Sequence, residues 1–319
     1  MKPLFISNII ESKIRKEASV SNINQVLVTV SGGPDSMATL HCLHKICKEI
    51  IALHCNFHLR GEESDRDMYF VKEYCDQNDI ILDIINFDVL DYLKKNNKIS
   101  LEMACRQLRH EWFRTKLKET GFQRIVTGHN ADDNIETLLI NLLRGSGSRG
   151  LSGMSRDNGI IWRPFLNLHR LEILRYLEEN NINYIVDSSN LECDFRRNFL
   201  RNKIIPLLKS QWPGLDTSLT KVIENIEAEN KIVEKSIVSQ LPVKDQPLSA
   251  QTILDYPAPL LLIKRYIDIA GPYSATSEEI FRAILANKPH IRKWKLRHGI
   301  IILRNGNLFI EMSHGKRCS

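Results

Sequence analysis

Val26-Leu-Val-Thr-Val-Ser-Gly-Gly-Pro-Asp-Ser-Met37 reads as a strand, a sharp turn and the start of a helix. Residues 26–30 are apolar or β-branched, which suits a short buried strand. The turn, Ser31–Ser36, has two adjacent glycines and places backbone N–H groups at a helix N-terminus, where phosphate binds well. It lacks the lysine of the G-x-x-x-x-G-K-S/T loop. The glycine pair alone is also compatible with an ordinary strand–helix turn.

Strands and helices alternate on both sides of this stretch. After the first strand, further strands are expected at 50–56, 80–86 and 124–127, and helices at 35–47, 67–77, 100–119, 132–143 and 168–180. This alternation predicts an α/β fold with a doubly wound parallel sheet. Ligands of such sheets bind beyond the carboxyl ends of the strands, which here carry the polar turns 31–36, 56–60 and 128–133.

The sequence changes character after Trp212-Pro-Gly214. We therefore expect a first domain at 1–212 and a smaller second domain at 213–319. The second domain begins with a long polar helix and is expected to be mostly helical. Residues 293–311 predict a closing β-hairpin, because Asn305-Gly306 is a strong hairpin turn signal.

The composition excludes several classes of protein. The chain has 319 residues, of which 43% are hydrophobic and 26% charged, and no run of about 18 apolar residues, so we expect no membrane span. Its seven cysteines form no C-x-x-C pair, which argues against a disulfide framework or a zinc site and fits the reducing cytoplasm. The net charge of +6 is compatible with a polyanionic partner.

Acidic and basic side chains follow the predicted strands at helical spacing. In Gly128-His-Asn-Ala-Asp-Asp-Asn-Ile-Glu-Thr137, several carboxylates and His129 come within reach of one pocket. Carboxylates beside a triphosphate favour Mg²⁺, although Asp132 and Asp133 are equally compatible with an N-capping pair. Arg106 and Arg109 share a helical face with Glu102, and Arg197 and Arg201 lie one turn apart. Either pair could contact phosphate or simply form a solvated surface.

Together, these stretches resemble the tRNA(Ile)-lysidine synthetase family, which is a branch of the N-type ATP pyrophosphatases, or PP-loop enzymes. The matching segments cover about two-thirds of the chain in the family's order. They are S-G-G-P-D-S at 31–36, H-C-N-F-H-L-R at 54–60, E-M-A-C-R-Q-L-R at 102–109, G-H-N-A-D-D-N-I-E-T at 128–137, L-L-R-G-S-G-S-R-G-L at 142–151, R-P-F-L at 163–166, D-S-S-N at 187–190 and R-R-N-F-L-R-N at 196–202.

The resemblance implies a reaction. ATP would be cleaved between its α- and β-phosphates to adenylate the wobble cytidine of a tRNA(Ile) with a CAU anticodon at the C2 oxygen. The amine of L-lysine would then displace AMP, and the resulting lysidine would read AUA instead of AUG. ATP and Mg²⁺ are the expected cofactors, the cytoplasm is the expected location, and a homodimer is one expected assembly.

The resemblance also implies which residues act. Catalytic roles would fall to Asp35, Arg106, His129 and Asp132. ATP would be bound by Ser31, Gly32, Gly33, Pro34, Asp35, Ser36 and Arg109. Mg²⁺ would be held by Asp35 and Asp133, and the tRNA or substrate by Asp187, Arg197 and Arg201. The chain departs from the pattern at Asn130, where the family often has a second histidine. Longer members carry a further C-terminal domain, so the chain resembles the shorter class or is a fragment.

Other functions compete with this one on the sequence alone. A PP-loop tRNA thiolase such as a 2-thiocytidine synthetase shares the loop, but the paired cysteines of those enzymes are absent here. GMP and NAD synthetases share the loop without the arginine-rich segment at 142–202. A non-catalytic RNA-binding relative is a different class, and the intact loop and acidic residues argue against it.

Overall fold

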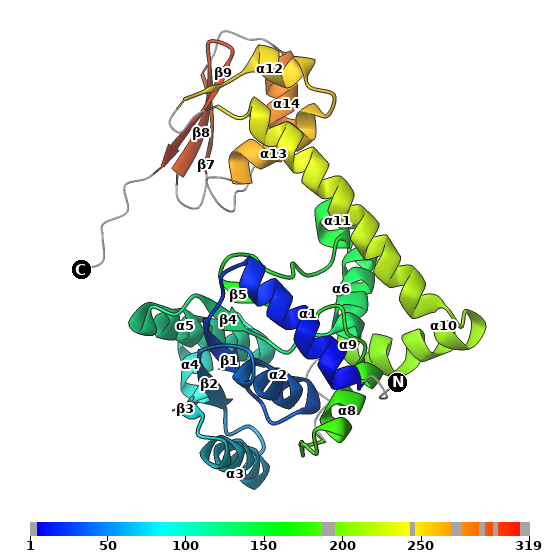
Figure 1. The fold of residues 1–319 in the computed structure, drawn as a ribbon. Coiled ribbons are helices and arrows are strands. Elements are labelled where there is room, and N and C mark those ends of the chain that lie inside the picture. The colour runs from blue at the N-terminus through cyan, green and yellow to red at the C-terminus, as the bar shows by residue number, and fades with distance from the viewer. Residues whose placement is uncertain are drawn as a thin grey trace. The chain divides into compact units, whose positions relative to one another are not determined.

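The chain forms two compact units, residues 1–226 and 227–319 (Figure 1). The computed structural model describes residues 5–186, 195–242, 246–268, 276–286, 291–295 and 299–312. The division between the units falls within helix α11 (Leu215–Gln240), further along the chain than the boundary expected after residue 212. The helix crosses the division because it contains neither proline nor glycine.

The first unit is built on a five-stranded parallel sheet in the order β3-β2-β1-β4-β5. The strands are β1 (Gln25–Thr29), β2 (Glu49–Asn56), β3 (Ile81–Asn86), β4 (Arg124–Val126) and β5 (Ile161–Trp162). The chain moves outward from β1 to β3 and then returns to the other side of β1, so the direction of winding switches between β1 and β4. The predicted doubly wound α/β fold is therefore confirmed, and this switch point is where ligands of such sheets bind.

Helices connect the strands and cover both faces of the sheet (Figure 1). Those of the first unit are α1 (Ile6–Val20), α2 (Pro34–His44), α3 (Glu62–Gln77), α4 (Val89–Lys95), α5 (Leu101–Thr120), α6 (Ala131–Leu143), α7 (Ser148–Leu151), α8 (Arg170–Glu179), α9 (Phe195–Phe199), the π-helical turn η2 (Leu200–Ile204) and α10 (Ile205–Gln211). None of the helices in the described part of the chain is both long enough and apolar enough to span a bilayer.

Strand β1 explains why both faces need covering. Val26 and Val28 point to one face and join a core with residues of α1, α2 and α8. Leu27 points to the opposite face and packs with Trp112 and Phe113 of α5. All three strand residues are fully buried. Because successive strand side chains alternate between faces, a continuously apolar strand requires a helix layer on each side.

The second unit packs helices against an antiparallel sheet in the order β6-β9-β8-β7. Its elements beyond α11 are β6 (Leu248–Ser249), α12 (Ala250–Asp255), α13 (Pro259–Asp268), α14 (Ser277–Leu285), β7 (Arg292–Lys295), β8 (Gly299–Arg304) and β9 (Asn307–Met312). Asn305 and Gly306 both have positive φ, as the predicted hairpin turn requires. The predicted hairpin is confirmed as β8–β9, and the segment before it adds β7 as an edge strand.

Candidate active site

The loop between β1 and α2 is braced by its own serines. The Ser36 hydroxyl accepts a hydrogen bond from the Ser31 amide at 3.2 Å and donates one to the Gly33 carbonyl at 2.8 Å. Gly32 has a φ of 90°, which favours glycine, and Pro34 is the first residue of α2. Ser36 is buried and Ser31 is exposed. The loop is thus a rigid turn at the N-terminus of α2, as an anion site requires.

Gly128, which follows β4, packs directly on this loop. A Cβ atom at Gly128 would lie 2.9 Å from both the carbonyl carbon and the carbonyl oxygen of Asp35, and 3.1 Å from the Ser36 amide nitrogen. These are backbone atoms, which cannot move aside as a flexible side chain can. The close approach brings the turns that follow β1 and β4 together at the switch point of the sheet.

Replacing Gly128 by alanine should therefore displace the loop. We expect a loss of about 1–3 kcal/mol in the free energy of unfolding, as for other overpacked sites, and weaker ATP binding. Urea unfolding and nucleotide titration measure the two effects. Gly214→Ala is the matched control, since a Cβ there meets nothing within 4 Å. Equal behaviour of the two variants would show that the contact at Gly128 is unimportant.

Asp35 connects the loop to the turn after β4 and to the start of α8. Its Oδ1 accepts a hydrogen bond from Asn130 Nδ2 at 3.1 Å, and its Oδ2 forms an ion pair with Arg170. Burial raises the pKa of Asp35, and the Arg170 guanidinium and the Asn130 amide act in the opposite direction. The carboxylate of Asp133, the other predicted Mg²⁺ ligand, also raises the pKa of Asp35.

Asn130 joins the turn after β4 to the loop after β1. Its Oδ1 caps α6 by accepting a hydrogen bond from the Asp133 amide at 3.0 Å, and the Asp133 carboxylate accepts one from the Asn130 amide at 3.1 Å. This reciprocal capping box leaves the Asn130 side-chain NH₂ able to donate to Asp35. At the position where the resembled family often has histidine, this chain therefore has a residue that both caps a helix and orients a carboxylate.

Asp132 is bound by the start of α8. Its two oxygens accept hydrogen bonds from His169 Nδ1 at 3.2 Å and from the Arg170 amide at 3.1 Å. Burial favours a higher pKa for Asp132, but these two hydrogen bonds outweigh it and the pKa lies below its ordinary value. Asp132, His169 and Asp216 could together hold a metal ion, although Asp216 already pairs with Lys209 at 2.7 Å. His169 and Arg170 were not among the residues predicted from the sequence.

The Asp132–His169 pair predicts a pH-dependent stability. The hydrogen bond that His169 donates to Asp132 raises the pKa of His169. The contribution of His169 to stability is therefore complete below about pH 6.5 and is lost as the pH rises through its folded-state pKa. The lowered pKa of Asp132 gives a contribution that is present above about pH 4 and is lost as the pH falls through its folded-state value. The pair should thus be strongest between about pH 4 and 6.5.

His169→Asn should therefore destabilise the chain more at pH 5.5 than at pH 8.5, while asparagine still caps α8. The difference should stay below about 1 kcal/mol, because both side chains are about one-third exposed. Urea unfolding of both proteins at the two pH values measures it. An equal loss at both pH values would mean that the ion pair does not contribute.

Glu136 of α6 binds the two arginines that the sequence assigned to tRNA or substrate. Its side chain is 2% exposed and lies 2.8 Å from Arg197 Nε and 2.5 Å from Arg201 Nε. Arg201 also reaches Asp133 at 2.9 Å. The predicted spacing of one helical turn is therefore present, but both guanidiniums join α9 and η2 to α6. The third residue of that group, Asp187, lies outside the described residues.

His129 and the arginines of α5 border the same edge of the sheet. His129 Nδ1 lies 2.7 Å from Thr127 Oγ1, and burial, with the nearby arginines, lowers the pKa of His129 to about 4 although Asp133 opposes this. The imidazole is therefore neutral at pH 7 and can accept a proton. Arg106 is exposed, and its charge is among those that lower the pKa of His129. The Arg109 guanidinium lies 5.3 Å from the centre of the Phe57 ring.

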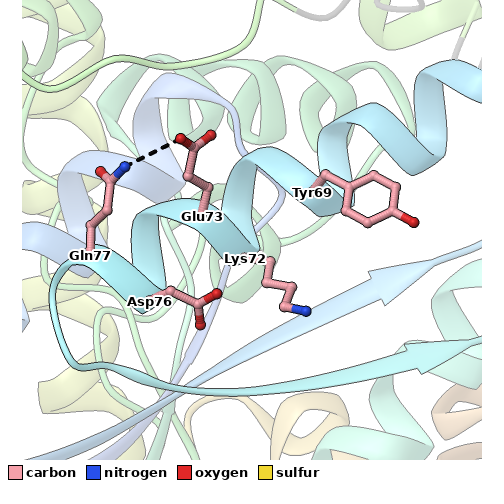
Figure 2. A pocket seen from close by; sticks show the side chains of 5 residues that line it. All are labelled: Tyr69, Lys72, Glu73, Asp76 and Gln77. Atoms are coloured by element: carbon pink, nitrogen blue, oxygen red, sulfur yellow. Dashed lines mark hydrogen bonds between the residues drawn. The ribbon is translucent and has the colours of Figure 1, made fainter.

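A surface hollow elsewhere on the first unit contains none of these residues. It has a volume of about 550 Å³ and is lined by Tyr69, Lys72, Glu73, Asp76 and Gln77. Figure 2 shows that all five side chains extend from α3, with Gln77 Nε2 3.2 Å from Glu73 Oε1. A site lined by a single helix is open to solvent, and we assign it no role in the chemistry.

Comparison with known proteins places this geometry in a family. Residues 6–208 match the PP-loop domain model. A curated tRNA(Ile)-lysidine synthase from Porphyromonas gingivalis is 38% identical over 315 residues, which cover 97% of this chain and 68% of the relative. The chain belongs to the tRNA(Ile)-lysidine synthase family. Members from Parabacteroides distasonis and Bacillus subtilis are 38% and 33% identical, over 85% and 74% of this chain. The chain spans 62% and 52% of those two members' lengths.

A solved structure supports the fold alone. The U34-tRNA thiolase NcsA from Methanococcus maripaludis, determined with its 4Fe–4S cluster, superposes with a TM-score of 0.57 over 70% of this chain and 79% of the thiolase, at 20% identity. Within the described residues of this member of the lysidine synthase family, the group of side chains placed to hold a metal contains no cysteine.

Proposed function

We propose that this chain is a tRNA(Ile)-lysidine synthetase, which joins L-lysine to C2 of the wobble cytidine of a tRNA(Ile) with a CAU anticodon. The observation that carries the proposal is the contact between the Ser31–Ser36 loop and the turn after β4, in a chain of this family. Gly128 packs on the Asp35 backbone, and Asn130 donates a hydrogen bond to the Asp35 carboxylate. A loop that presents amides at a helix N-terminus suits the triphosphate of ATP. The free cysteines fit a cytoplasmic location.

The residues present fit a Mg²⁺ ion. Asp35 and Asp133 offer carboxylate oxygens, the ligands that Mg²⁺ prefers beside phosphate. Both carboxylates now bind arginine, so each already attracts a cation. When bound, Mg²⁺ would neutralise charge on the departing pyrophosphate.

The first chemical step would form the adenylate. The cytosine C2 oxygen attacks the α-phosphorus of ATP, and the bond to the β-phosphate oxygen breaks as pyrophosphate leaves. The main-chain amides and hydroxyls of the Ser31–Ser36 loop would hold the phosphates. Arg106 would stabilise the negative charge that develops on the α-phosphate, because its guanidinium is exposed and its charge acts on His129.

The second step would form the carbon–nitrogen bond. The lysine amine attacks C2, the bond from C2 to the adenylate oxygen breaks, and AMP leaves. The amine must lose a proton. His129 is neutral at pH 7 and has an unprotonated ring nitrogen that would accept it, although a pKa of about 4 makes it a weaker base than an ordinary histidine. Its contact with Thr127 fixes the ring.

Transfer of radiolabelled lysine tests the proposal. The full chain, ATP, labelled L-lysine and a CAU-anticodon tRNA(Ile) should give labelled RNA, and a tRNA with a changed wobble base should remain unlabelled. ATP-dependent labelling that is independent of the wobble base, or no labelling at all, would contradict it.

We also propose that exposed cations of each unit contact the tRNA. In the first unit these are Arg144, Arg149 and Arg196, and in the second unit they are Arg292, Lys293 and Lys295 of the edge strand β7. Reversing the charges of Arg292, Lys293 and Lys295 together should weaken tRNA binding. It should also make the salt dependence shallower, by about 0.7–0.9 in slope for each phosphate that the protein no longer neutralises. Fluorescence anisotropy at several salt concentrations measures both.

The matched control reverses three exposed lysines of the first unit, Lys13, Lys16 and Lys48. It changes the net charge equally, so it separates a local contact from a general effect. Unchanged tRNA affinity in the β7 variant at low salt would remove this strand from the binding surface.

A further inference from the structure

Two adjacent residues at the start of α8 bind both predicted catalytic aspartates. Arg170 forms an ion pair through Nη1 with Asp35 Oδ2, while its backbone amide donates to Asp132 Oδ2 at 3.1 Å. His169 holds the other oxygen of Asp132 at 3.2 Å. The partners are far apart in sequence, since 135 residues separate Asp35 from Arg170. The start of α8 is therefore part of the site rather than only a support for the sheet.

Arg170 combines a fixed backbone with a partly exposed side chain. Its amide is tied to Asp132, and it is the first residue of α8, whose N-terminus carries a partial positive charge. The side chain is 41% exposed, whereas that of Asp35 is 23% exposed. The guanidinium can thus change partner without any movement of the helix. A planar cation of this type matches a phosphate group with two parallel hydrogen bonds.

Arg170 and a divalent cation would compete for one carboxylate. Asn130 donates to Asp35 Oδ1 and Arg170 pairs with Oδ2, so a metal ion held by Asp35 would lie beside the guanidinium and be repelled by its positive charge. A guanidinium displaced from Asp35 lies at the loop that would hold the triphosphate.

We propose that Arg170 is a phosphate-binding residue of the ATP site. This inference rests on the proposed use of ATP. The Arg170 guanidinium leaves Asp35 and binds the triphosphate when a divalent cation binds the Asp35 carboxylate. No covalent bond changes in this exchange. A merely structural arginine would hold Asp35 in place and would have no contact with the nucleotide.

Two binding measurements on the full chain test this, neither of which needs turnover. Mn²⁺ binding without nucleotide, followed by electron paramagnetic resonance, should become about 3–10-fold tighter in Arg170→Gln, because a competing cation is removed. The affinity for α,β-methylene ATP with Mg²⁺ should fall about 10–100-fold in the same variant, of the order expected for one charged phosphate contact. Arg170→Lys should lie between Arg170→Gln and the unaltered chain in both measurements.

Control variants show whether the changes in Mn²⁺ and nucleotide affinity come from Arg170 and Asp35. Arg175→Gln changes an exposed arginine on the same helix and should alter neither affinity. Adding Asp35→Asn to Arg170→Gln should abolish the gain in Mn²⁺ affinity, which locates the ion at Asp35. Weaker or unchanged Mn²⁺ binding in Arg170→Gln, or unchanged nucleotide affinity, would overturn the inference. If the chain binds nucleotide but transfers no lysine, the proposed function is contradicted. The Mn²⁺ and nucleotide affinities would still decide whether Arg170 binds phosphate.

Discussion

Replacing Asp35 by alanine should slow ATP-dependent adenylation by about 10²–10³-fold, the range typical of removing a group that stabilises transition-state charge. The chain should remain folded. Burial raises the pKa of Asp35, so the folded state gains no stability from the charged form of this carboxylate. Single-turnover release of pyrophosphate measures the chemical step, and thermal unfolding confirms that the structure persists.

Asp76→Ala is the control for this prediction. Asp76 is an exposed carboxylate on α3 and lines the open hollow of Figure 2. Its removal should change neither pyrophosphate release nor the melting temperature. A loss below about 10-fold for Asp35→Ala would remove Asp35 from the chemistry.

Replacing Glu136 by glutamine should mainly destabilise the fold, whereas Asp35→Ala should mainly slow the reaction. The buried carboxylate is the shared counter-charge of Arg197 and Arg201, and its removal leaves two guanidiniums facing a neutral group. Breaking a buried ion pair costs about 3–5 kcal/mol. We expect about 2–4 kcal/mol here, because Arg197 and Arg201 are 31% and 39% exposed and partly solvated. Urea unfolding measures the change.

An exposed ion pair provides the comparison for Glu136. Asp91 and Lys95 lie 2.6 Å apart on α4, and their side chains are 50% and 72% exposed. Asp91→Asn should leave the urea midpoint unchanged within error. If Glu136→Gln behaves in the same way, then Arg197 and Arg201 do not depend on Glu136. They would then be better regarded as RNA contacts alone, as the family resemblance implied.

Most of the fold could be predicted because it depends on local patterns. The apolar run at 26–30, the helical spacing after Met37 and the Asn305-Gly306 turn each correspond to an observed element. Strand β5 was missed because it has only two residues, Ile161 and Trp162, too few for a periodic pattern. The domain boundary expected after residue 212 differs from the division within α11, because Trp212-Pro-Gly214 forms a turn inside the first unit.

The candidate site was only partly predictable from the sequence, because its contacts join residues that are far apart in the chain. Three polar turns at strand ends were expected to meet, and Gly128 does pack on the Asp35 backbone. Their partners could not be foreseen, since Arg170 meets Asp35 only when the chain is folded. Leu-His-Arg at 168–170 has no spacing that distinguishes it from an ordinary helix start. The spacing of Arg197 and Arg201 was informative about a shared face but not about Glu136 as its partner.

The fate of the α-phosphate of ATP tests the central claim most directly. The full chain is mixed with ATP labelled at the α-phosphorus and with CAU-anticodon tRNA, first without lysine and then with it. Our account predicts that pyrophosphate is released and that label accumulates on the RNA. Added lysine should then release the label as AMP, with one AMP for each lysine joined. Formation of labelled ADP, or release of AMP without prior labelling of the RNA, would contradict the account.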